Sequence, residues 1–296
     1  MWLRGRGSDE EIIPVMTISY VFPNTSENRL RGRLDDRSRR AKEAGCSFIE
    51  VPADLIKNKT EVSVTGQEFC TFLTRESIGK LYLPAENPAG ILPYILHTDP
   101  ALNKMVRLRW NDPVWTEKFV RMILDISEYL GTPPAKVEIH PGDRENSYAD
   151  IVRGVKAIQT GFHDSYRKSP EILLENRTDQ FISRGPAIAK LWDYVMQNDP
   201  GLAENFGIVL DIQQLLTMTG EDFLPSFNQI PAACLKGFHI HRLHRPPAVG
   251  DGIPWPEVFA RIASLRHDVI INPEVHHNNQ VAGVIGFCRE MVHSSS

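Results

Sequence analysis

Eight short, mostly apolar runs, separated by longer amphipathic stretches, limit most strongly what this chain can fold into. Each run is continuous rather than alternating in polarity, which is typical of strands in a parallel sheet covered on both faces. The runs lie at residues 15–20, 47–51, 93–97, 136–140, 171–175, 207–211, 237–241 and 269–274. Eight strands that alternate with helices predict a closed (β/α)8 barrel, or TIM barrel.

The stretches between these runs carry the signals of helices. We expect helices at residues 27–44, about 65–80, 114–130, 147–165, 185–197, 220–228, 256–264 and 279–292. Gly131 follows the third of them, as glycine commonly does at the end of a helix. The longest interval between strands, residues 52–92, is predicted to be an elaborated, lid-like connection.

An open doubly wound sheet is the main alternative fold. Such a sheet would carry a glycine-rich phosphate turn after its first strand. The stretch TISYVFPNTSEN, which follows the first run, contains no glycine. The sequence therefore favours the barrel.

The length and composition fit one domain. The chain has 296 residues, of which 42% are hydrophobic and 24% charged, so it can bury a sizeable core. We expect a single TIM-barrel domain over residues 1–296, with the barrel at about 15–292 and residues 1–13 and 293–296 at its periphery.

Charge and hydropathy narrow the partners. The net charge of −4 gives no general attraction to nucleic acid or to an anionic membrane. The start, MWLRGRGSDEE, lacks the apolar segment of a signal peptide, and no apolar run reaches the length of a membrane span. The four cysteines show no CxxC spacing, which is typical of reduced, buried thiols. We expect a cytoplasmic protein with no membrane partner, and a homo-oligomer stays open.

Six consecutive strands end in a residue that binds metals well. These residues are His97, His140, Glu175, Asp211, His241 and Glu274. In a parallel barrel the carboxyl ends of all strands meet at one rim, where active sites of this fold lie. One such residue is commonly structural, but six in register predict a shared metal centre. Imidazole and carboxylate ligands without cysteine indicate one or two divalent ions, either Mn²⁺, Zn²⁺, Co²⁺ or Fe²⁺.

The motifs around these residues resemble those of a known family. They are LHTDP at His97, IHPG at His140, LLENRTDQF at Glu175, VLDIQQ at Asp211, the segments HIHRLHR and VGDGIPW, and NPEV at Glu274. In this order, over about residues 15–290, they are similar to the xylose isomerase-like TIM barrels. That family groups endonuclease IV with isomerases and epimerases of sugars and sugar phosphates.

The resemblance implies two sets of metal ligands. It implies that a divalent metal is held by Glu175, Asp211, a histidine of the HIH pair and Glu274. It also implies that His97 and His140 correspond to positions that bind an additional metal in the nuclease branch. Of the HIH pair, His241 lies nearer the rim and is the predicted ligand; His239 points the same way but deeper, as a less favoured ligand or its partner.

In the sugar branch, two carboxylates remove and return a proton beside a metal-polarised carbonyl. Glu175 and Glu274, on different sides of the barrel, are the predicted catalytic pair. We expect His244 and Arg245 to face the substrate, since Arg245 resembles the arginine that orients substrate oxygens or a phosphate. Two further candidates for substrate binding are Gln214 and Asn176. Asn176 is also placed to orient Glu175.

An AP endonuclease similar to endonuclease IV is the alternative function. Two departures weigh against it: Gln214 stands where that branch has a histidine, and HRPPA replaces its Asp-x-His pair. Nucleic-acid binding also calls for a basic surface, which the net charge does not suggest. We therefore predict a metal-dependent sugar or sugar-phosphate isomerase or epimerase of carbohydrate metabolism. A non-catalytic barrel that binds a metabolite is a third hypothesis.

Overall fold

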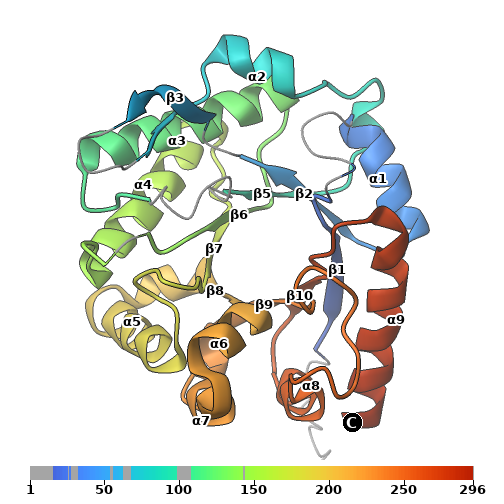
Figure 1. The fold of residues 1–296 in the computed structure, drawn as a ribbon. Coiled ribbons are helices and arrows are strands. Elements are labelled where there is room, and N and C mark those ends of the chain that lie inside the picture. The colour runs from blue at the N-terminus through green and yellow to red at the C-terminus, as the bar shows by residue number, and fades with distance from the viewer. Residues whose placement is uncertain are drawn as a thin grey trace, which may run out of the picture.

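The chain forms a closed barrel of eight parallel strands with helices packed around it (Figure 1). The computed structural model describes residues 16–25, 27, 33–53, 56–62, 68–98, 108–142 and 144–295. Around the barrel the strand order is β1, β10, β9, β8, β7, β6, β5 and β2. The strands are β1 (Ile18–Phe22), β2 (Phe48–Pro52), β5 (Tyr94–His97), β6 (Lys136–Ile139), β7 (Glu171–Glu175), β8 (Phe206–Asp211), β9 (Leu235–His239) and β10 (Val269–Asn272). The predicted (β/α)8 TIM barrel is confirmed.

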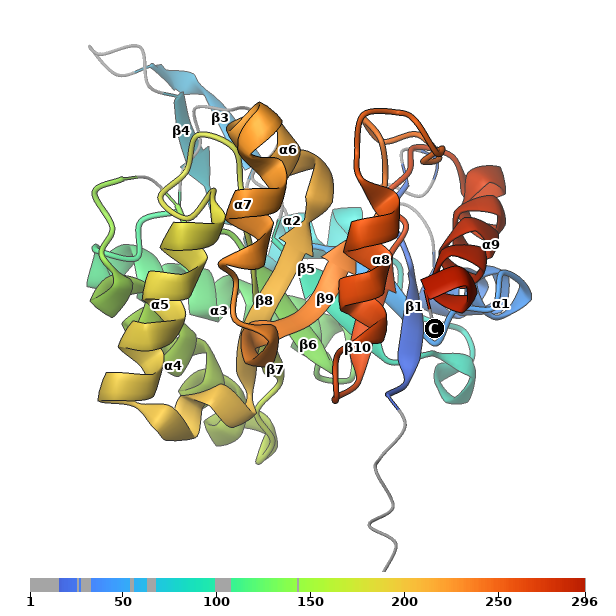
Figure 2. The ribbon, with the colours of Figure 1, turned by 90° about the horizontal axis from the view of Figure 1, so that it is seen from below.

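The helices lie outside the strands, as Figures 1 and 2 show. They are α1 (Leu34–Glu43), α2 (Arg75–Leu81), α3 (Pro113–Leu130), α4 (Tyr148–Tyr166), α5 (Gly185–Asn198), α6 (Ile212–Thr219), α7 (Phe223–Asn228), α8 (Trp255–Ala263) and α9 (Asn278–Ser295). Helix α3 begins where the carboxylate of Asp112 accepts hydrogen bonds from the amides of Val114 and Trp115. It ends at Gly131, which adopts the left-handed conformation with φ 79°.

Two expected helices differ from the structure. The segment expected as one helix at 220–228 follows a helix that the sequence did not predict, α6, which begins directly after β8. The Asp211 carboxylate accepts a hydrogen bond from the amide of Gln214 at 2.9 Å, so the residue that ends the strand also caps this helix. Two helices, α6 and α7, therefore occupy the connection.

The expected helix at about 65–80 is half hairpin. An antiparallel pair, β3 (Ile56–Val62) and β4 (Glu68–Thr71), precedes the short helix α2. Thr74 starts that helix with a capping box formed with Ser77. Because the hairpin follows β2, it lies at the carboxyl end of the barrel, and Figure 2 shows it projecting beyond the strands. The predicted elaboration of residues 52–92 thus consists of a hairpin and a helix.

The first helix is shorter than expected. Arg33 is extended, with φ −63° and ψ 145°, and the helix begins at the next residue. Residues 1–15, 26 and 28–32 lie outside the described residues. The predicted periphery at 1–13 and the early part of the expected helix 27–44 therefore lie there too.

Inside the barrel, an apolar layer lies beneath a polar one. Five buried residues form a separate cluster at the lower level: Val21, Ile95, Leu173, Val209 and Ile270. Two residues further along the same strands, and so on the same inner face, stand His97, Glu175, Asp211 and Asn272. The larger core packs between the outer face of the strands and the helices. The fold therefore directs polar side chains to one end of its interior.

Cys46, Cys234 and Cys288 are buried free thiols. Burial raises the pKa of the Cys46 and Cys234 thiols to about 12, so both are protonated and unreactive at neutral pH. Among the described helices, none is both long and apolar enough to cross a membrane.

Candidate metal centre

The six predicted metal ligands lie at the carboxyl end of the barrel. Five of them, His97, His140, Glu175, Asp211 and His241, are at most 2% exposed. The side chain of Glu274 is 20% exposed, so it faces the opening. His241 and Glu274 each stand two residues beyond the end of their strand, because β9 ends at His239 and β10 at Asn272.

One group of ligands gathers around Glu175. The Nε2 atom of His140 lies 2.6 Å from Glu175 Oε2, and that of His97 lies 3.3 Å from the same oxygen. The two imidazole Nε2 atoms are 3.4 Å apart, and their rings meet edge to face. These three side chains can offer one atom each to a single ion.

A second group gathers around Glu274. The Nε2 atom of His241 lies 3.1 Å from Glu274 Oε2 and 3.4 Å from Asp211 Oδ2. The Nδ1 atom of His239 lies 3.4 Å from the same Glu274 oxygen, and Asp211, His239 and Glu274 can offer one atom each to a single ion. Sequence reasoning favoured His241 over His239, but both face Glu274.

The electrostatics of the centre favour ionised carboxylates. Burial alone would raise the pKa of Glu175, but His140, His97 and Arg177 lower it well below its ordinary value. For Glu274, burial is likewise outweighed by His239 and His241, which lower its pKa well below the ordinary range. The carboxylates are therefore negatively charged at neutral pH, and the pocket suits a cation.

The loop after β9 holds the two predicted substrate-facing residues. It turns tightly between Arg242 and Arg245, whose backbone groups exchange hydrogen bonds of 2.9 and 3.1 Å. The two residues between them, Leu243 and His244, both have positive φ, at 52° and 56°. His244 stacks on His241 with ring centroids 4.7 Å apart, and its amide donates to His241 Nδ1 at 3.0 Å. Arg245 is exposed on this loop.

The other two predicted substrate residues are already engaged with the protein. Asn176 is fully buried, and its side-chain amide makes hydrogen bonds of 2.8 and 3.2 Å with the backbone of Asp211. The side-chain oxygen of Gln214 accepts hydrogen bonds from the amide and the hydroxyl of Thr178. This arrangement favours Asn176 as a support for Asp211 rather than as a substrate contact.

The donor set fits a divalent cation. Within the described part of the chain, several buried atoms of the centre make no hydrogen bond: Glu138 Oε1, His140 Nδ1, Glu175 Oε1, His239 Nδ1 and Glu274 Oε2. Buried polar groups are nearly always satisfied, so such a concentration needs an explanation. Imidazole and carboxylate atoms are the ligands that Zn²⁺, Mn²⁺, Co²⁺ and Fe²⁺ share.

Solved structures of similar shape come from two kinds of enzyme. D-psicose 3-epimerase from Clostridium cellulolyticum H10, solved with D-tagatose, aligns at 12% identity with a TM-score of 0.55, over 93% of this chain and 99% of its own. An AP endonuclease, family 2, from Brucella melitensis aligns at 12% identity and 0.58, over 92% and 98%. A xylose isomerase domain protein from Alicyclobacillus acidocaldarius aligns at 13% and 0.54, over 94% and 99%. The chain has the xylose isomerase-like barrel fold. No protein-family model and no curated protein sequence matches it.

Two glutamates of this xylose isomerase-like barrel were not among the predicted site residues. Glu138 Oε1 lies 2.9 Å from His239 Nε2, and Glu50 Oε1 lies 2.7 Å from His97 Nδ1. Glu138 stands two residues before His140 and therefore points to the same side of β6. The alternation that placed His239 inside the barrel would have placed Glu138 there as well.

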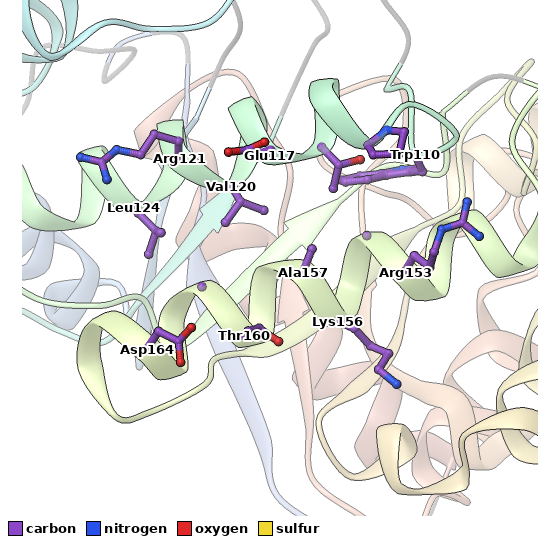
Figure 3. A pocket seen from close by; sticks show the side chains of 14 residues that line it. Trp110, Glu117, Val120, Arg121, Leu124, Arg153, Lys156, Ala157, Thr160 and Asp164 are labelled. Atoms are coloured by element: carbon purple, nitrogen blue, oxygen red, sulfur yellow. The ribbon is translucent and has the colours of Figure 1, made fainter.

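A larger hollow of the xylose isomerase-like barrel lies away from this centre. A groove of about 770 Å³ runs between α3 and α4 on the outside of the barrel. Figure 3 shows Val120, Leu124 and Ala157 along its floor, with Arg121 and Asp164 near one end. None of the predicted metal ligands lines it.

Proposed function

We propose that the chain is a metal-dependent isomerase or epimerase of a sugar or sugar phosphate, working through an enediolate. One observation carries the proposal. Glu175 and Glu274 approach one buried imidazole from two sides, since His239 Nδ1 lies 3.9 Å from Glu175 Oε1 and 3.4 Å from Glu274 Oε2. Two carboxylates from opposite walls thus flank the same point of the barrel mouth. Proton transfer on two faces of a sugar requires such a pair.

A divalent ion bound there supplies the Lewis-acid polarisation of a carbonyl and its neighbouring hydroxyl. Glu175, Asp211, His241 and Glu274 would hold it. Glu274 is ionised and faces the opening, so its carboxylate can remove the proton from the carbon beside the carbonyl. Glu175 lies on the other side, and His140 Nε2, at 2.6 Å, is within reach to supply the proton that Glu175 returns. Return to the opposite face of that carbon gives an epimer, and return to the neighbouring carbon gives an isomer.

The substrate class follows from the rim. Gln214 is turned to Thr178 by its hydrogen bonds, so it does not complete a third metal site of the kind the nuclease branch has. A D-psicose 3-epimerase solved in the presence of D-fructose is among the solved structures of similar shape. Ketoses are therefore the first substrates to test, with Arg245 on the mobile-sized loop surface as the group that would meet a phosphate.

The nuclease reaction is the second candidate. The group formed by His97, His140 and Glu175 favours it, since these residues match the positions of that branch's additional metal. Cleavage of a phosphodiester at an abasic site would use water activated at this group.

One experiment separates the hypotheses. Protein reconstituted with Mn²⁺ or Zn²⁺ is incubated in D₂O with ketoses, ketose phosphates and, separately, a duplex containing an abasic site. We expect deuterium to enter one ketose beside its carbonyl as it is converted, and we expect EDTA to stop the exchange. Cleavage of the duplex without sugar turnover would reverse the assignment. Binding of a sugar without exchange would support a non-catalytic, metabolite-binding barrel.

A further inference from the structure

A second layer of ionisable side chains lies below the rim ligands. Glu138 on β6 and His239 on β9 stand two residues before His140 and His241, so they point into the barrel one step deeper. Both are at most 1% exposed. The proposed reaction uses neither of them to contact substrate. A buried carboxylate and a buried imidazole at this depth are costly unless something compensates them.

The ring of His97 is held so that one nitrogen points into this layer. Its Nδ1 atom lies 2.7 Å from Glu50 Oε1, a distance at which Nδ1–H donates to the carboxylate. Asn272 fixes the other oxygen of Glu50 with a 3.0 Å hydrogen bond. The Nε2 atom of His97 is thereby turned toward Glu138 and Glu175. This is how a carboxylate commonly orients a metal-binding histidine.

The atoms around that nitrogen are spaced as ligands rather than as hydrogen-bond partners. His97 Nε2 lies 3.5 Å from Glu138 Oε1 and 3.3 Å from Glu175 Oε2. A proton on Nε2 would draw one carboxylate oxygen to about 2.7–2.9 Å. Ligands at 2.0–2.1 Å around a tetrahedral ion are instead separated by about 3.3–3.4 Å. The observed separations match the second case.

His239 completes the group. Its Nε2 atom lies 2.9 Å from Glu138 Oε1, and its Nδ1 atom lies 3.9 Å from Glu175 Oε1. Glu138, Glu175 and His239 can each offer an atom to one ion. Among the described side chains, Glu138 Oε1, Glu175 Oε1 and His239 Nδ1 are buried without a hydrogen bond. These three unsatisfied atoms come from three different strands and face one another.

We propose that Glu138, His239 and Glu175, together with His97, bind a second divalent cation of the Zn²⁺ or Co²⁺ type beneath the rim ion. With four protein ligands the site is closed, and closed sites of this kind stabilise a fold rather than activate water. The ion joins strands β5, β6, β7 and β9 at the base of the proposed centre. The site differs from the nuclease-like group because it requires Glu138 and His239 and does not require His140.

The test counts ions per chain. Protein stripped with a chelator is reconstituted with Zn²⁺ or Co²⁺, and the bound metal is measured after gel filtration. We expect two ions per wild-type chain and one in Glu138→Gln and in His239→Asn. His140→Asn is the matched control, since it changes a histidine of the same layer boundary on the same strand as Glu138. We expect it to keep two ions.

Other outcomes decide against the site. Two ions in Glu138→Gln and one in His140→Asn would place the second ion in the nuclease-like group. A single ion in the wild type that is lost in Asp211→Asn but kept in Glu138→Gln would overturn the deep site and leave the proposed function standing. The wild-type count and X-ray absorption of its Zn²⁺, expected to show two nitrogen and two oxygen ligands at the deep ion, need no variant to fold. Conversely, two ions without any sugar turnover would support the site and overturn the proposed function.

Discussion

The Nδ1 atom of His97 and the Oε1 atom of Glu50 are 2.7 Å apart, and both side chains are buried at the base of the candidate centre. Burial would raise the pKa of Glu50, but its hydrogen bond to His97 and the charge of that ring hold it below its ordinary value. Glu50 therefore acts as a carboxylate that fixes the orientation of His97, and through it the direction in which the ring presents Nε2.

The variant Glu50→Gln tests that role. The amide cannot hold the imidazole as the carboxylate does, so we expect metal affinity and turnover to fall about 10- to 100-fold. Metal affinity is measured by titration of the chelator-stripped protein. Glu27→Gln is the matched control, because Glu27 also pairs with a histidine, His277, at 3.0 Å, but on the surface. Equal losses in both variants would contradict the role given to Glu50.

The paired carboxylates make a second prediction. Glu274→Gln keeps the shape of the side chain but removes its ability to take a proton, so we expect kcat to fall by about 10²- to 10⁴-fold. Glu175→Gln is expected to have an effect of the same order. Turnover and deuterium exchange are measured on the ketose that the wild type converts, and circular dichroism checks the fold. Near-normal exchange in either folded variant would remove that residue from the catalytic pair.

The sequence predicted the barrel because strands buried on both faces read as continuous apolar runs. It predicted the rim ligands because parallel strands bring their carboxyl ends together. It missed Glu138 because attention to the last residue of each strand passes over the inward residue one step deeper. It could not show that Glu274 faces both His239 and His241, since that depends on how side chains leave the loops after β9 and β10.

The hairpin β3–β4 was hidden for a different reason. Residues 65–80 end in a true helix, α2, and a periodic pattern read over the whole segment extends that helix backwards. The start of α6 was hidden because Asp211 serves at once as the end of a strand, as a helix cap and as a candidate ligand. One residue with three roles gives only one signal in the sequence.

Arg245 and Arg242 provide a matched pair for substrate recognition. Arg245 is exposed on the loop, whereas Arg242 donates to the Gln213 side chain at 2.6 Å and to the Asp251 backbone at 2.9 Å. We expect Arg245→Gln to raise KM about 10-fold for a phosphorylated ketose and to leave kcat within about twofold, since a lost guanidinium–phosphate contact weakens binding. Arg242→Gln is expected to lower thermal stability instead. A KM for the phosphorylated ketose that Arg245→Gln leaves unchanged would show that Arg245 does not bind phosphate.

Asp150 gives a prediction that is independent of the metal centre. Its Oδ2 atom accepts hydrogen bonds from the amide of Ser147 at 2.7 Å and from its hydroxyl at 2.6 Å, at the start of α4. Burial alone would raise the pKa of Asp150, but these bonds and Arg153 lower it below the ordinary value of 3.8. Because the pKa is lower in the folded than in the unfolded chain, the stabilisation is complete above the unfolded value. It is lost as the pH falls through the folded value.

We therefore expect Asp150→Asn to reduce the free energy of unfolding by about 1 kcal/mol at pH 7, as the loss of a capping interaction does. The difference from wild type should stay constant down to about pH 5 and narrow below about pH 4, because both chains then carry an uncharged side chain at this position. Urea unfolding at several pH values measures it. Asp193→Asn, at an exposed position of α5, is the control, with an expected change within about 0.5 kcal/mol. A difference that widens toward acid pH would mean that the Asp150 carboxylate does not stabilise the start of α4 by its charge.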